Sequence, residues 1–176
     1  AGEAAMTSVD ELLATMSAPA TDKVILTVDE DLRIITIPSL ALVIGAQGDK
    51  NVNRIYFKMN RYYRGTDFAK FTPRVNYINA LKKKYHYDPA DLVVENDSLM
   101  FSWLIRGPVA QASGEVTFSI CMRQMNQNEV DAEFNTTTAG VKCLVSIDSD
   151  GSESDIQYTG TVAVLNEAIL GEAVLA

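Results

Sequence analysis

The chain has 176 residues, of which 47% are hydrophobic and 22% charged, which is the composition of an ordinary globular protein. We expect one domain, or one domain with extensions, and no wholesale disorder. No apolar run approaches the ~20 residues needed to cross a bilayer, and Ala1–Thr7 lacks the basic and apolar regions of a secretory leader. We therefore expect neither a membrane span nor a signal peptide.

The formal net charge is −8, and it is unevenly distributed along the chain. Residues 50–84 hold ten Lys and Arg against one acid, a net of +9, so the remainder carries −17 (−8 minus +9). Opposed charges of this kind favour stacking on further copies or docking on a charged surface.

The first predicted element is a short helix over residues 8–17. Ser8 is a good N-cap, and Glu11 completes a capping box. The apolar positions at helical spacing are Val9, Leu12, Leu13 and Met16. A helix this short is marginal alone, so residues 1–21 are predicted to be an arm that docks on the domain or on a partner.

From residue 24 onward the pattern is typical of β-structure, with short β-rich segments between turns. The expected strands, in chain order, are 24–28, 33–37, 40–44, 51–60, 71–80, 85–87, 92–95, 99–105, 115–123, 129–135 and 141–147. Residues 61–70 are expected to be a loop, and 96–97 a tight hairpin turn. The spacing predicts an antiparallel sandwich or barrel, and we expect a β-sandwich over residues 22–147.

Two strands show strict alternation of apolar and polar residues. In 51–60 the apolar side is Ile55, Phe57 and Met59, and the opposite side carries Arg54, Tyr56 and Lys58. In 115–123 the predicted inward side chains are those of Val116, Phe118, Ile120 and Met122. Alternation at period two is typical of half-buried strands.

Residues 148–176 are predicted to hold an acidic loop and an apolar segment, either a strand or a docking element. The loop over 148–155 superficially resembles a calcium loop, but its glycine comes too early and Thr159 stands where a bidentate Glu is needed. We therefore interpret it as a solvated acidic turn.

Catalytic and metal-binding groups are sparse. The single histidine, His86, excludes a zinc site built from several His and Cys, and no nucleophile or carboxylate is paired with it in the sequence. Cys121 and Cys143 are expected to behave as small apolar residues rather than as a disulfide. No cofactor or metal is expected.

A basic, aromatic stretch is the strongest surface candidate. It contains Arg54, Tyr56, Lys58, Arg61, Tyr62, Tyr63 and Arg64. Tyr and Arg dominate protein interfaces, so we predict a protein-docking face. Plain surface and a single-stranded nucleic-acid site are the alternatives; the acidic remainder of the chain argues against nucleic acid.

Several segments together carry a family resemblance. They are RIITIP, NVNRIYFKMNRYY, FTPRVNYINA, NDSLMFSWLIRGPVAQASGEVTFSICM and EFNTTTAG, within about residues 24–146. They resemble a β-sandwich domain of phages and prophages of Gram-positive bacteria, found at the N-terminus of baseplate upper proteins and in head-fibre and minor structural proteins. The resemblance implies a non-enzymatic virion component in which this domain is an anchor.

The first hypothesis is therefore a virion structural subunit, expected to form a homo-oligomer on other capsid or baseplate proteins, with a fibre or receptor-binding protein as a further partner. Because no long stalk follows the domain, capsid decoration or a head-fibre base is favoured slightly over a baseplate adaptor. The second hypothesis is a carbohydrate-binding module that uses exposed aromatics, with candidates Tyr56, Tyr62, Tyr63, Tyr85 and Tyr87. The third, and weakest, is an enzyme acting through His86.

Overall fold

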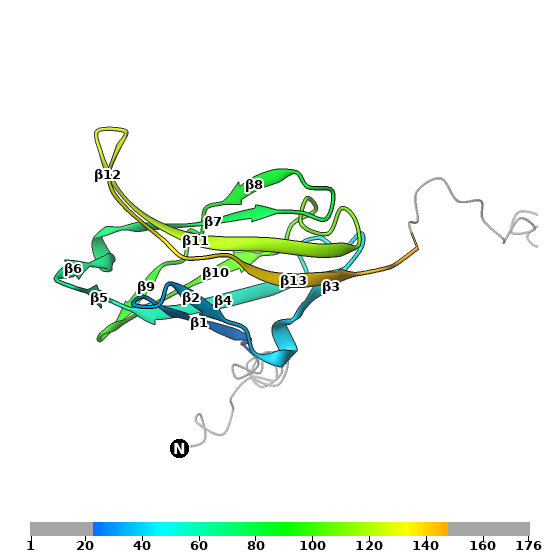
Figure 1. Ribbon diagram of the computed structural model, residues 1–176, viewed down its shortest axis with the longest axis horizontal. Coiled ribbons are helices and arrows are strands. Elements are labelled where there is room, and N and C mark those ends of the chain that lie inside the picture. Colours follow the sequence, from blue (N-terminus) through cyan, green and yellow to red (C-terminus); the bar gives the residue numbers. More distant parts are fainter. Residues whose placement is uncertain (1–22, 148–176) are drawn as a thin grey trace, which may run out of the picture. The chain divides into compact units, whose positions relative to one another are not determined.

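The computed structural model describes residues 23–147, which contain two β-sheets packed face to face (Figure 1). The first sheet, sheet A, has the strand order β2-β1-β4-β10-β9. Its strands are β1 (Ile25–Asp29), β2 (Ile34–Thr36), β4 (Arg54–Asn60), β9 (Val93–Glu95) and β10 (Ser98–Leu104).

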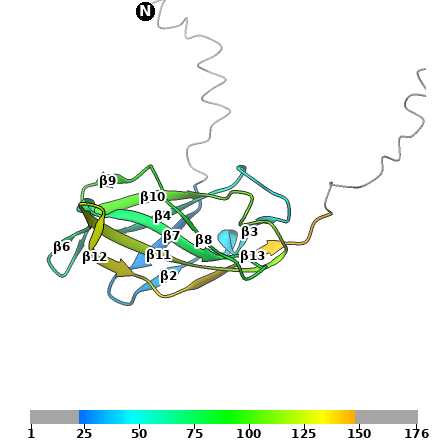
Figure 2. The ribbon, with the colours of Figure 1, turned by 90° about the horizontal axis from the view of Figure 1, so that it is seen from above.

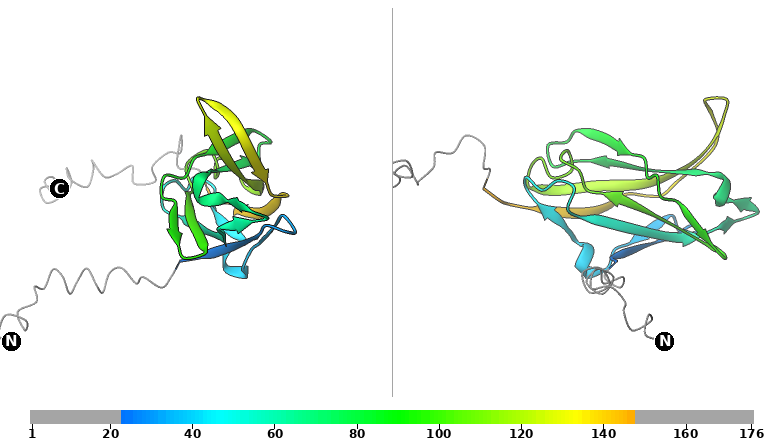
Figure 3. Two further views of the ribbon diagram at one scale, coloured as in Figure 1. Left: turned by 90° about the vertical axis from the view of Figure 1, so that its left-hand side faces the viewer. Right: turned by 180° about the vertical axis from the view of Figure 1, so that it is seen from behind.

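The second sheet, sheet B, has the order β3-β13-β11-β7-β8, and β12 pairs with the far half of β11. Its strands are β3 (Val43–Ala46), β7 (Thr72–Ile78), β8 (Lys84–Tyr87), β11 (Gly114–Asn126), β12 (Glu129–Asn135) and β13 (Ala139–Leu144). Turned by 90°, the two sheets lie one over the other, and the β11–β12 hairpin extends past the rest of sheet B (Figures 2 and 3).

The predicted β-sandwich is confirmed, but its pairing is not purely antiparallel. β1 runs parallel to β4, and β3 runs parallel to β13. The cause is the route of the chain, which leaves the β1–β2 hairpin, crosses to sheet B as β3 and returns to sheet A as β4. A strand that returns after such a crossover can lie parallel to its neighbour, whereas a tight hairpin cannot.

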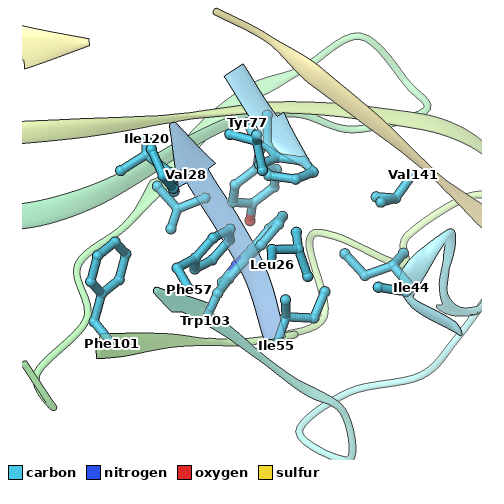
Figure 4. Close-up of a cluster of buried hydrophobic side chains, with 14 of the residues drawn as sticks. Leu26, Val28, Ile44, Ile55, Phe57, Tyr77, Phe101, Trp103, Ile120 and Val141 are labelled. Atoms are coloured by element: carbon cyan, nitrogen blue, oxygen red, sulfur yellow. The ribbon is translucent and has the colours of Figure 1, made fainter. Parts of the chain in front are cut away.

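The core lies between the sheets and follows the predicted alternation. Ile55, Phe57 and Met59 are buried from sheet A, and Val116, Phe118, Ile120 and Met122 from sheet B. Trp103 is fully buried at the centre, where its ring lies 5.3 Å from that of Phe118 (Figure 4). Aromatic pairs at this distance stabilise a core beyond the area that they bury.

The expected strand over 40–44 is wrong at its start. Residues Ser39–Ala41 form a 3-10 turn, and β3 begins only at Val43. Pro38 immediately precedes this turn, and Leu40 is largely exposed, so the apolar run does not mark a buried strand.

The expected loop over 61–70 also has regular structure. It folds into the two-residue strands β5 (Tyr62–Tyr63) and β6 (Thr66–Asp67), followed by a 3-10 turn at Phe68–Lys70. The connecting residues Arg64 and Gly65 both have positive φ, as the tightest hairpin turns require.

The predicted turn at Asn96-Asp97 is confirmed between β9 and β10. The turn between β11 and β12 consists of Gln127 and Asn128, because Asn126 still pairs with Glu129. The predicted arm over 1–21, its residues Val9, Leu12, Leu13 and Met16, and the whole of 148–176 lie outside the described residues. Within residues 23–147 there is no helix long and apolar enough to span a membrane.

Candidate functional site

The outer face of β4 carries three of the predicted docking residues. Arg54 and Lys58 are exposed and Tyr56 is partly exposed, while the residues between them point into the core. Arg54 donates a hydrogen bond to Ser102 Oγ at 2.6 Å, and the Lys23 ammonium lies 4.9 Å from the centre of the Tyr56 ring. The alternation predicted from the sequence is therefore present.

Neighbouring strands extend this surface with apolar side chains. Ile25 of β1 pairs with Tyr56, Met100 of β10 pairs with Lys58, and Val93 of β9 pairs with Met100. Paired residues in adjacent strands point to the same side of a sheet. We call this surface the β4 face and define it by Ile25, Arg54, Tyr56, Lys58, Val93 and Met100.

A hollow of about 430 Å³ lies beside Lys58, Val93 and Met100 on this face. Sequence analysis missed the apolar members, although each is a non-core position of its strand. The signal that would have found them is strand pairing, which a single sequence does not give.

The other four predicted docking residues lie beyond the end of β4, and the fold uses them differently. Arg61 makes two hydrogen bonds to the Asp67 carboxylate, at 2.9 and 3.0 Å. This guanidinium, together with the backbone N–H of Ala69, holds the pKa of Asp67 down to about 2. Arg64 lies 3.7 Å from Asp31, and Tyr62 is exposed.

Tyr63 belongs to a cluster of aromatic rings at this end of the sandwich. Its ring centre lies 6.0 Å from that of Phe68 and 5.2 Å from that of Phe134. The Arg33 guanidinium lies 4.0 Å from the centre of the Phe134 ring and donates a hydrogen bond to the Tyr63 hydroxyl. We call Tyr63, Phe68, Phe71 and Phe134 the end cluster. The structure thus places three of the seven predicted residues on the β4 face, packs Tyr63 into the end cluster, pairs Arg61 with Asp67, and leaves Tyr62 and Arg64 exposed.

A second hollow, of about 370 Å³, lies where the edge of sheet B meets sheet A. Its lining includes Tyr77, Tyr85, Tyr87, Trp103 and Arg106. The rings of Tyr77 and Tyr85 stack with their centres 5.5 Å apart, and burial raises the pKa of Tyr77 to about 12, so its hydroxyl stays protonated. The buried Trp103 Nε1 has no hydrogen-bond partner among the described residues. We call this hollow the aromatic pocket.

The structure separates the five tyrosines predicted to bind a glycan. Tyr85 and Tyr87 line the aromatic pocket, Tyr56 lies on the β4 face, and Tyr62 and Tyr63 lie in β5. Only the first two share a hollow, and Tyr77 and Trp103 of that hollow were not among the candidates.

His86 lies on β8 with its side chain about half exposed. Its Nε2 is 3.8 Å from Asp88 Oδ2, but Arg74 already holds the Asp88 carboxylate with two hydrogen bonds. Arg74 thereby lowers the Asp88 pKa. In residues 23–147 no three His, Cys, Asp or Glu side chains gather as a metal site.

Cys121 and Cys143 are both buried and unpaired, as expected from the sequence. Burial raises the pKa of the Cys121 thiol to about 11, so that little thiolate forms near neutral pH.

No protein-family model matches the chain, and no curated protein matches it. Among solved structures, the chain is similar to the N-terminal domain of phage TP901-1 ORF48, with a TM-score of 0.44 and 13% sequence identity. The match covers 71% of this chain and 98% of the other. A similarity this weak assigns no property of that domain to this chain.

Proposed function

We propose that the chain is a non-enzymatic structural subunit of a bacteriophage virion, mounted on the particle as an anchoring or decorating protein. Capsid decoration, a head-fibre base and a baseplate adaptor are the forms that this role can take. The partners would be other virion proteins and further copies of the chain.

The observation that carries the proposal is the placement of the segments that resemble the phage sandwich domain. RIITIP contains β2, NVNRIYFKMNRYY contains β4 and β5, and FTPRVNYINA contains β7. The longest segment contains β10 and most of β11, with Trp103 at the centre of the core. The resemblance therefore includes strands of both sheets of the sandwich, together with the connection over 105–113 between β10 and β11.

The β4 face supplies a surface suited to mounting. It combines exposed Ile25 and Val93 with the partly exposed ring of Tyr56 and the charge of Lys58. Tyr56 and the exposed Arg54 of this face are of the residue types that are enriched in protein-binding hot spots.

The test is electron microscopy of intact particles of the phage that encodes the chain, labelled with gold-conjugated antibody raised against the full chain. Preimmune serum is the control, and a blot of dissociated particles shows whether the protein is present at all. Label on heads supports decoration or a head-fibre base, and label on the tail tip supports a baseplate adaptor. Particles that are negative by both label and blot overturn the proposal.

A second candidate function, glycan binding, is favoured by the aromatic pocket. Sugar rings pack their apolar faces against aromatic side chains, while their hydroxyls accept hydrogen bonds from groups such as the exposed Arg106 guanidinium. A glycan array with the wild-type chain tests this function. Binding that is lost in Tyr85→Ala but retained in Tyr56→Ala would support it, and an array without signal would reject it.

A further inference from the structure

Two surface features lie at opposite ends of the long strand β11 (Figure 1). Near its start, Thr117 pairs with Ile78, after which β7 turns into β8. At its end, Asn126 pairs with Glu129 across the β11–β12 turn. At ~3.3 Å per residue, Thr117 and Asn126 are separated by roughly 30 Å.

The first feature is a basic corner between β7 and β8, formed by Leu81, Lys82, Lys83 and Lys84. All four are exposed, Leu81 by 48%. The fully buried Asn79 holds the turn, because its Oδ1 accepts hydrogen bonds from the backbone N–H groups of Leu81 and Lys83, each at 3.0 Å. Asn79 Nδ2 in turn donates to Pro108 O at 3.0 Å. We call these four residues the lysine corner; its backbone is fixed before any partner arrives.

The second feature is the tip of the β11–β12 hairpin. Gln127 and Asn128 form its turn with φ of 51° and 71°. Beside the turn, Met125 and Val130 are a cross-strand pair, 44% and 47% exposed. We call residues 125–131 the hairpin tip.

The charge of the hairpin tip comes from Glu129 and Asp131, both exposed, which flank Val130 along β12. Because strand residues alternate between faces, the side chains of the apolar pair lie on one face of the tip and the two carboxylates lie on the other. A partner that docks against the end of this two-stranded tip contacts side chains from both faces. The base of the hairpin is fixed, since Phe134 of β12 is buried in the end cluster.

We propose that the hairpin tip of one copy of the chain docks on the lysine corner of the next copy. Lys82, Lys83 and Lys84 would meet Glu129 and Asp131, and Leu81 would pack against Met125 and Val130. Opposite charges steer and orient protein association, and the apolar side chains add area that becomes buried in the contact. The inference deepens the homo-oligomer of the proposed function by naming its interface.

A second copy is the occupant because both complementary surfaces belong to one chain. The two surfaces lie at opposite ends of β11. Two copies side by side and antiparallel satisfy both contacts in a two-fold dimer, whereas a head-to-tail arrangement gives a ring or a filament.

The test measures self-association of the full chain by sedimentation and light scattering over a range of concentrations, at 50 and 500 mM NaCl. The corner variant is Lys82→Glu with Lys83→Glu, and the tip variant is Glu129→Lys with Asp131→Lys. Each variant alone is expected to associate at least tenfold more weakly than wild type. Salt should weaken the wild-type assembly, because the contacts are exposed charges.

Mixing the two variants provides the decisive measurement. The corner variant has an acidic corner and an acidic tip, and the tip variant has a basic corner and a basic tip. Each tip then finds an opposite corner only on the other variant, so the mixture is expected to recover association. The control for the corner variant is Lys50→Glu with Lys70→Glu, which changes the net charge as the corner variant does, at exposed lysines outside both surfaces. This control should associate as wild type does.

A wild-type chain that stays monomeric, association that ignores the variants, or a mixture without recovery would each overturn the interface. Particle labelling separates this result from the proposed function. Label on particles without self-association of the chain supports the virion role and rejects the interface. Self-association that depends on the two surfaces, without label on particles, supports the interface and rejects the virion role.

Discussion

The two halves of the basic, aromatic stretch over residues 54–64 have similar composition and different structural surroundings. In β4, Tyr56 and Lys58 point away from the core, and the fold does not depend on them for packing. Beyond β4, Tyr63 packs into the end cluster and Arg61 is bound to Asp67. Residue type alone therefore does not separate exposed side chains from packed ones; strand register and chain reversal do.

The strongest way to sharpen this comparison is to remove the centre of the end cluster. Phe68 is buried against Tyr63, Phe71 and Phe134. We expect Phe68→Ala to lower the free energy of unfolding by about 3–5 kcal/mol, because a large cavity is left among rings that cannot close over it. Urea denaturation followed by tryptophan fluorescence measures the loss. A loss below about 1 kcal/mol would show that the end cluster does not stabilise the domain.

The most direct test of the comparison substitutes one tyrosine in each half. Tyr63→Ala removes ring contacts with Phe68 and Phe134 and a hydrogen bond from Arg33, so we expect a loss of about 1–3 kcal/mol. Tyr56→Ala is the matched control, with an expected change of at most about 1 kcal/mol. Equal losses in the two variants would remove the distinction between the halves.

The Arg61–Asp67 pair gives a smaller effect that is visible only in acid. The folded pKa of Asp67, about 2, lies below its ordinary value of 3.8. The stability from this pair is therefore fully present above about pH 4 and is lost as the pH falls through 2. In Asp67→Asn, the free energy of unfolding should lack this part of its decrease in acid.

Urea midpoints at pH 5, 3 and 2 measure this difference between wild type and Asp67→Asn. Arg74 also lowers the pKa of Asp88. Asp88 therefore lowers the stability of both proteins in acid by the same amount, and its effect cancels from the difference between them. Parallel curves for the two proteins would show that Asp67 is not specially stabilised as a carboxylate.

The smallest effect on stability is expected on the β4 face. Lys58→Ala should change the free energy of unfolding by no more than about 0.5 kcal/mol, because the side chain is exposed. The same variant should reduce incorporation of the chain into phage particles, measured by blot of purified particles complemented with the variant. Unchanged incorporation would indicate that the β4 face is not the mount.

Much of the fold could be predicted because alternation is a local property of a strand. The inward residues of β4 and β11 and the turn between β9 and β10 were all expected. The strand expected over 40–44 was wrong because an apolar run after Pro38 is compatible with an exposed 3-10 turn. The interior role of Tyr63 could not be predicted, since its partner Phe134 lies far along the chain.

The sequence by itself determined the β class, the positions of most strands, and which side chains β4 and β11 bury. These follow from period-two patterning and turn chemistry, which act over a few residues. Only the tertiary structure decided that β1 pairs with β4 and β3 with β13, that Ile25, Val93 and Met100 complete the β4 face, and that four tyrosine and tryptophan rings line one pocket. The physical reason is that strand order is set by how two whole sheets bury their inner faces together, and no local pattern of residues encodes that choice.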